Sequence, residues 1–108
     1  MEINREDILQ IVLASLSNTV EMTTGDAVTA DSFRESTRLI GHEAVLDSMG
    51  LVSMILEVEQ NILDRFGVVI IIADERAMSQ KRSPFRSVET LTDYVYELVK
   101  EQTESARS

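Results

Sequence analysis

The first hydrophobic pattern along the chain predicts a helix close to its N-terminus. Apolar residues recur at steps of three and four, as one face of an α-helix requires, at Ile8, Leu9, Val12, Leu13, Leu16 and Val20. Asn4 is placed to cap such a helix, and Ile3 can pack on Ile8 as a hydrophobic staple. We therefore expect this helix to begin near residue 5.

The pattern disappears between residues 21 and 47, where Thr, Gly, Asp and Ser dominate. The few bulky apolar residues there are Phe33, Leu39 and Ile40, and the last two are expected to anchor a long loop in the core. Loops of this length are unusual in compact domains, so a turn of helix over residues 32–36 is an alternative.

A second helix is predicted to begin at Asp47 or Ser48 and to end at Phe66, because Gly67 supplies a C-terminal stop. Helical spacing is followed by Val52, Ile55, Leu56, Glu59, Ile62, Leu63 and Phe66. The apolar arc is widened further by Met49, Leu51, Met54 and Val58. An arc this wide indicates a central helix that contacts several neighbours.

The β-branched run over residues 68–72 has the composition of a buried strand, but the chain offers no second run to pair with it. A short extended connector over the core is therefore favoured over an edge strand. Asp74 can then cap a short helix over residues 75–78.

The last helix is predicted to follow Ser87 as its N-cap, with a buried stripe made by Val88, Leu91, Val95, Leu98 and Val99. Residues 103–108 are polar and are expected to fray. The chain thus predicts one all-α domain over residues 1–108, with its core at about 5–102. It would be a small four-helix bundle with three main helices, one short helix and a long loop between helices 1 and 2.

Charge narrows the possible partners. The 108 residues include 10 Lys and Arg against 19 Asp and Glu, a net charge of -9, which opposes binding to nucleic acid or anionic lipid. No apolar run approaches the ~20 residues that span a bilayer, and there is no cysteine. We expect a cytoplasmic monomer without stable membrane insertion, whose partners carry basic patches.

Catalytic centres find little support in the sequence. His42 is the only histidine, and Ser48 lies in Leu-Asp-Ser-Met-Gly rather than in a Gly-x-Ser-x-Gly elbow. Neither a set of metal ligands at fixed offsets nor a Gly-rich nucleotide loop is recognisable. The chain is therefore not expected to be an enzyme, and an enzyme that uses His42 with nearby acids is kept as a remote alternative.

Ser48 is unusual in its placement, because it follows an acid, ends a long loop and opens a very apolar helix. A helix N-terminus has unpaired N–H groups and a positive dipole, so a phosphodiester on this serine would be well tolerated. The simplest alternative is that Asp47 and Ser48 only cap the helix.

The segment Leu39–Phe66, with Leu46-Asp47-Ser48-Met49 and the acidic Glu57-Val58-Glu59, resembles the signature of acyl carrier proteins. The order of the predicted elements is also similar to the order in that family over roughly residues 5–100. The similarity continues through Phe66-Gly67 to Ser87-Val88-Glu89-Thr90-Leu91. The resemblance implies that a phosphopantetheinyl transferase attaches 4'-phosphopantetheine from coenzyme A to Ser48. The thiol of the arm would carry acyl groups as thioesters to enzymes with basic docking patches.

By the same resemblance, Asp47 belongs to the attachment motif, and the residues expected to face partner enzymes are Glu43, Asp47, Met49, Glu57 and Glu59. The chain departs from the family at Gly50 and Ser53, where acids commonly stand. Its second helix is also about one turn longer than in fatty-acid-synthesis members. Met49 and Met54 are adaptable side chains that would let the helices part around an acyl chain.

Three alternatives stay open. Leu-Asp-Ser-Met-Gly is also similar to D-alanyl carrier proteins, which load an amino acid, whereas the Gly-Gly-x-Ser lead of peptidyl carriers is absent. A small helical adaptor without a prosthetic group is the alternative from another class. Ser32 in Asp31-Ser32-Phe33 repeats the acid-serine-apolar order, but no long apolar helix follows it, so Ser48 is preferred.

Overall fold

A computed structural model describes residues 3–25, 33–39, 46–72 and 84–107 of the chain. These residues form three helices and no strand: α1 (Arg5–Thr24), α2 (Ser48–Phe66) and α4 (Val88–Arg107). The all-helical architecture is therefore confirmed. The short helix predicted over residues 75–78 lies outside the described residues, so the four-helix count stays a prediction.

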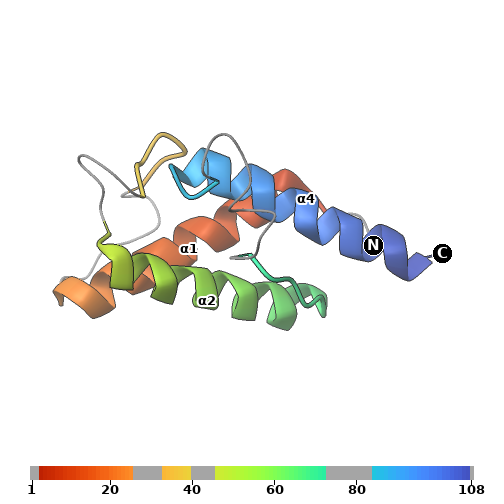
Figure 1. Ribbon diagram of the computed structural model, residues 1–108, viewed down its shortest axis with the longest axis horizontal. Coiled ribbons are helices and arrows are strands. Elements are labelled where there is room, and N and C mark those ends of the chain that lie inside the picture. Colours follow the sequence, from red (N-terminus) through yellow and green to blue (C-terminus); the bar gives the residue numbers. More distant parts are fainter. Residues whose placement is uncertain (1–2, 26–32, 40–45, 73–83, 108) are drawn as a thin grey trace.

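Helix α1 lies at the centre of the described fold (Figure 1). It packs against both α2 and α4, whereas the backbones of α2 and α4 do not come close together in the described part of the chain. The prediction that the second helix is central is therefore wrong. The prediction failed because α1 buries three small polar residues, Ser15, Ser17 and Thr19. These residues made α1 look amphipathic in the sequence, as if only one side of it faced the core.

The ends of α2 follow the predicted limits. Asp47 is its N-cap and Ser48 its first residue. At the other end Gly67 has a φ of 68°, and its N–H donates to the carbonyl oxygen of Leu63 at 2.9 Å. Glycine adopts this left-handed conformation without the steric cost that a side chain brings, so the stop signal acts as expected.

The ends of α1 and α4 agree only in part with the sequence. Helix α1 begins at Arg5 as predicted, although the side chain of Asn4 makes no capping hydrogen bond, and it continues to Thr24. Helix α4 starts after Ser87, whose Oγ accepts the Thr90 N–H at 3.3 Å. Helix α4 continues to Arg107, and the fraying expected over residues 103–108 stays a prediction.

Two non-helical segments complete the core. In the connector after α2, Ile70 and Ile72 are buried, and residues 67–72 form neither a helix nor a strand, which agrees with the prediction of a connector over the core. In the loop before α2, Thr37 N–H donates to the Arg34 carbonyl at 3.0 Å, so this stretch makes a turn and not a helix. Leu39 is fully buried as expected, and Ile40 lies outside the described residues.

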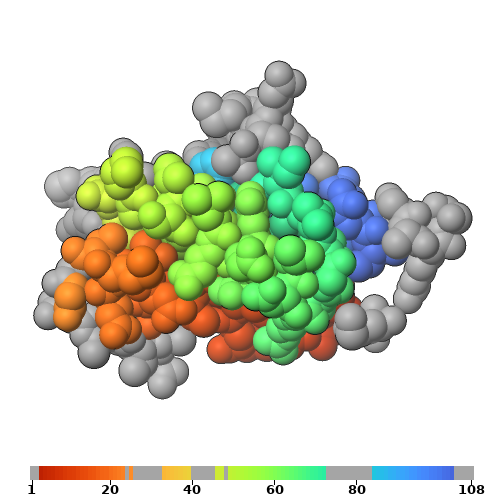
Figure 2. All heavy atoms as spheres, turned by 90° about the horizontal axis from the view of Figure 1, so that it is seen from below, coloured from red at the N-terminus to blue at the C-terminus, as the bar shows by residue number. Residues whose placement is uncertain are grey.

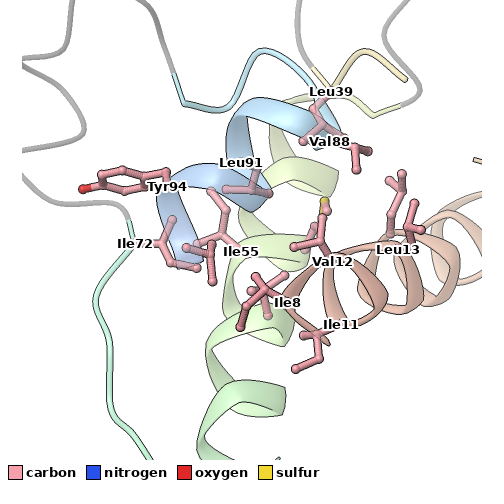
Figure 3. Packing of buried hydrophobic residues seen from close by; sticks show 14 of the residues in the cluster. Ile8, Ile11, Val12, Leu13, Leu39, Ile55, Ile72, Val88, Leu91 and Tyr94 are labelled. Carbon is pink, nitrogen blue, oxygen red and sulfur yellow. The ribbon is translucent and has the colours of Figure 1, made fainter. Parts of the chain in front are cut away.

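The buried apolar residues form one cluster to which all these segments contribute. Figure 3 shows the centre of the cluster, where α1 meets side chains from α2, α4, the loop and the connector. The labelled residues include Ile8, Val12, Ile55, Ile72 and Leu91. Burial of apolar surface from these four segments against α1 is the main force that assembles this fold.

Arg5 adds a polar link at the start of α1. Its guanidinium lies 2.6 Å from a carboxylate oxygen of Glu35 in the loop and 2.6 Å from one of Asp93 in α4. The hydrogen bond to Asp93 is the largest cause that raises the pKa of Arg5 above its ordinary value. The arginine therefore stays charged and connects three segments that are far apart in the sequence.

Thr92 offers a test of the α1–α4 packing. Its side chain is fully buried, and its hydroxyl has no hydrogen-bond partner within the described residues. We predict that Thr92→Val, which keeps the shape and removes the unpaired hydroxyl, raises the free energy of unfolding by about 1 kcal/mol. Urea denaturation followed by circular dichroism measures this change.

The matched control for that substitution is Thr19→Val. The Thr19 hydroxyl is also buried but donates to the Ser15 carbonyl oxygen at 2.8 Å. This substitution should therefore lower the free energy of unfolding, by about 0.5–1.5 kcal/mol. If both substitutions shift stability in the same direction, the hydroxyl of Thr92 is not unpaired in solution.

Candidate functional site

The candidate site is the N-terminal end of α2, where the sequence predicts the attachment serine, Ser48. Asp47 Oδ1 accepts the N–H of Gly50 at 2.7 Å, and the Asp47 carbonyl oxygen accepts the N–H of Leu51 at 2.9 Å. Asp47 thus caps the first turn with both its side chain and its main chain. Ser48 is located by its backbone as the first helical residue, and its side chain lies outside the described part of the chain.

Gly50 has a structural reason for lacking a side chain. It is buried, and a Cβ atom there would lie 3.2 Å from Asp47 Oδ1 and 3.2 Å from Leu46 Cδ2. Any larger residue would press on the capping carboxylate, and an acid would also place a second negative charge beside it. The departure from the family at this position therefore keeps the cap of Asp47 close to the start of α2.

Asp47 and Met49, the residues on either side of Ser48, are both exposed. The side chain of Met49 is 75% exposed, and Val52, one turn further along α2, is 55% exposed. Ser53 is exposed as well. Among the described residues that follow the serine in the first two turns of α2, the exposed side chains are therefore uncharged: Met49, Val52 and Ser53.

The acids of α2 that were predicted to face partner enzymes have internal partners. Glu57 Oε1 accepts the side-chain amide of Asn18 at 3.2 Å, and its Oε2 lies 3.4 Å from the Thr19 hydroxyl. Glu59 Oε2 accepts the N–H of Ile72 at 2.9 Å. Glu57 thus joins α2 to α1, and Glu59 joins α2 to the connector. Two further candidates, Glu43 and His42, lie outside the described residues.

The apolar arc of α2 is the feature that the sequence placed wrongly. Met54, Ile55, Val58 and Ile62 face the core, but Leu56 is 61% exposed and Leu63 is 40% exposed. Helical spacing indicates which positions share a face but not what covers them, so the wide arc predicted more neighbours for α2 than the described residues supply. Leu56 and Leu63 are seven residues apart, which is about two helical turns, so the sequence did contain a signal that they share a separate face of α2.

Other kinds of site find no support in the described residues. No group of three His, Cys, Asp or Glu residues among them is placed to hold a metal ion. None of the described helices combines the length and the apolar character that crossing a membrane requires. No known family model matches the chain, and neither a curated protein nor a solved structure matches it.

The cap of Asp47 can be measured. We predict that Asp47→Ala lowers the free energy of unfolding by about 1 kcal/mol, because the N–H of Gly50 loses its acceptor. Asp47→Asn should lower it much less, since asparagine caps helices nearly as well as aspartate. Urea denaturation of both variants checks this, and equal losses would show that the charge and not the cap matters.

The hydrogen bond of Glu57 gives a second prediction. Glu57→Ala should lower the free energy of unfolding by about 1 kcal/mol, because the Asn18 amide loses its partner and α1 is less tightly joined to α2. The matched control is Asp64→Ala, since Asp64 is exposed and, among the described residues, bonds Gln60 of its own helix. A loss for Asp64→Ala as large as that for Glu57→Ala would contradict this role.

Proposed function

We propose that the chain is an acyl carrier protein that bears 4'-phosphopantetheine on Ser48. The observation that carries the proposal is the position of Asp47-Ser48 at the start of α2, with the capping carboxylate directly before the serine. The order of elements supports it: a first helix, a long intervening stretch, the helix that begins at the serine, an apolar connector and a last helix.

The residues at this end of α2 fit such an arm. Three or four N–H groups at the start of a helix lack helical partners, and only one of them is taken by Asp47 Oδ1. The remaining donors and the positive end of the helix dipole stabilise the phosphodiester that joins the arm to the serine. When bound, the arm supplies a thiol that holds acyl groups as thioesters, while the protein itself catalyses no reaction.

The charge of the chain suits a carrier that must visit several enzymes. A net charge of -9 attracts basic patches over a distance, and the attraction weakens with salt, so that encounter and release are both fast. The partners of the proposal are a phosphopantetheinyl transferase and acyl-processing enzymes of fatty-acid, polyketide or related biosynthesis. We also propose that the protein is a monomer and acts in the cytoplasm.

A D-alanyl or other aminoacyl carrier is the second candidate. The buried Gly50 favours it, because this glycine belongs to the Leu-Asp-Ser-Met-Gly stretch that is similar to such carriers. Attachment of the arm to Ser48 is common to both candidates. A small helical adaptor is the third, and the exposed apolar residues of α2 are the observation in its favour.

Intact-mass spectrometry tests the proposal. Protein co-expressed with a broad-specificity phosphopantetheinyl transferase should gain the mass of one phosphopantetheine, and Ser48→Ala should abolish the gain. Ser53→Ala is the matched control, because Ser53 is an exposed serine of the same helix, and it should be modified like the wild type. Wild-type protein that stays unmodified with several transferases would overturn the carrier proposal and leave the adaptor.

A further inference from the structure

A polar hollow lies between the loop before α2 and the start of α4. It has a volume of about 260 Å³ and is lined by Ser36, Arg38, Arg86, Ser87, Glu89 and Thr90, and we call it the arginine hollow. In Figure 1 the loop and the start of α4 lie together above α1. Figure 2 shows that the face formed by α1, α2 and the connector includes only a small part of these segments. The arginine hollow is therefore separate from the surface of α2.

The main chain fixes the two walls of the hollow in register. Arg38 and Ser87 stand opposite one another in an antiparallel bridge. On one side of this pair the Leu39 N–H donates to the Arg86 carbonyl oxygen at 3.0 Å, and on the other side the first N–H of α4 donates to the Thr37 carbonyl oxygen at 3.0 Å. The backbones that carry the two arginines are thus held together before any ligand arrives.

The start of α4 does not itself offer donors to a ligand. The N–H groups of residues 88–90 are bonded, in that order, to the carbonyl oxygens of Thr37 and Glu35 and to Oγ of Ser87. The Thr90 hydroxyl is bonded to main-chain oxygens. What the hollow offers to a ligand is therefore its arginine side chains, together with the exposed Ser36.

Arg38 and Arg86 carry positive charge that is not used inside the described part of the chain. Both residues are exposed, and the ion pairs among the described residues involve Arg5 and Arg65. A guanidinium presents five N–H donors in a fork that matches the oxygens of phosphate or carboxylate. Two such groups on the walls of one hollow point to an oxyanion as its ligand.

The charges around the hollow narrow the choice of oxyanion. The chain carries a net charge of -9, and Glu89 adds a carboxylate to the lining, so an anion with a single charge gains little. A phosphate monoester carries close to two negative charges near neutral pH and has three acceptor oxygens, which two guanidiniums can share. The hollow is also smaller than the ~300–1,000 Å³ of sites that hold drug-sized ligands, so the ester is small.

We infer that the arginine hollow binds a small phosphate monoester, whose phosphoryl oxygens are shared between the guanidiniums of Arg38 and Arg86. The hydroxyl of Ser36 adds a donor at the same wall. This site goes beyond the carrier proposal, since it uses no residue of α2 and no group on Ser48.

NMR titration of the purified chain with methyl phosphate tests the inference. The ester should shift the side-chain Nε–H signals of Arg38 and Arg86, and the shifts should saturate with a single Kd. The variant Arg38→Gln/Arg86→Gln should raise this Kd at least about tenfold, because two charge-assisted contacts are lost. Both changes fall at exposed positions, so the helical content should persist, which circular dichroism checks.

The matched control is Arg34→Gln/Lys100→Gln. It removes the same two positive charges at exposed positions outside the hollow, so the Kd should stay within about twofold of the wild type at physiological salt. Glu89→Gln removes the carboxylate of the lining and should tighten binding by about two- to fivefold. Ser48→Ala should bind like the wild type, which separates this site from the carrier function.

Two other probes define the ligand. Acetate carries one charge and should bind at least about tenfold more weakly than methyl phosphate. A Gly-phosphoserine-Gly peptide presents the same phosphoryl group on a protein backbone, and it should bind no more tightly than methyl phosphate because the hollow is small. Tighter binding of the peptide would overturn the assignment to a free small ester and give the hollow to a phosphorylated protein.

Three other results would overturn the inference. One is the absence of any shift of the arginine signals up to about 50 mM methyl phosphate, well above the millimolar Kd that a few charge-assisted hydrogen bonds provide. Another is an equal loss of binding in the two double variants, which would show a general effect of charge. The third is acetate that binds as tightly as methyl phosphate.

Discussion

The fold depends on the burial of α1 between its two neighbours. Helices α2 and α4 each pack on α1, and their backbones do not come close to one another in the described part of the chain, so α1 supplies the surface that both require. Its buried residues include small polar side chains as well as apolar ones, and Ser15 and Thr19 both bond side chains of α2. Buried polar groups need hydrogen-bond partners inside the fold. The Ser15 hydroxyl oxygen, for example, accepts the side-chain amide of Asn61 at 2.9 Å.

This arrangement also decides how the surface of α2 is used. Among the described helices, α2 packs closely only on α1, and part of its apolar arc stays outside, between the N-terminal end that holds Ser48 and the connector. The acids Glu57 and Glu59 are engaged in holding the helix in place. Under the carrier proposal, partner enzymes would meet Ser48 beside the exposed apolar side chains of Met49 and Val52, so that shape as well as charge would contribute to recognition.

The local signals of the sequence predicted the limits of α2 well, because Asp47 and Gly67 act within one turn of the residues that they cap. The connector was also predicted, since a β-branched run without a second run cannot form a sheet. The central helix was not, because the burial of Ser15 and Thr19 depends on which neighbours they meet. The exposure of Leu56 was not predicted for the same reason. Periodicity shows which residues share a face of a helix, but it does not show whether another segment covers that face.

The position of α1 between α2 and α4 has a consequence for the order of folding. Helices α1 and α2 can meet as soon as both have been synthesised, but α1 and α4 stand at opposite ends of the described chain. Their contact closes a loop that includes almost every other residue, which makes it a late and entropically costly step. During synthesis, the side of α1 that packs on α4 therefore stays exposed until α4 has left the ribosome. In that interval the nascent chain can aggregate or bind a chaperone.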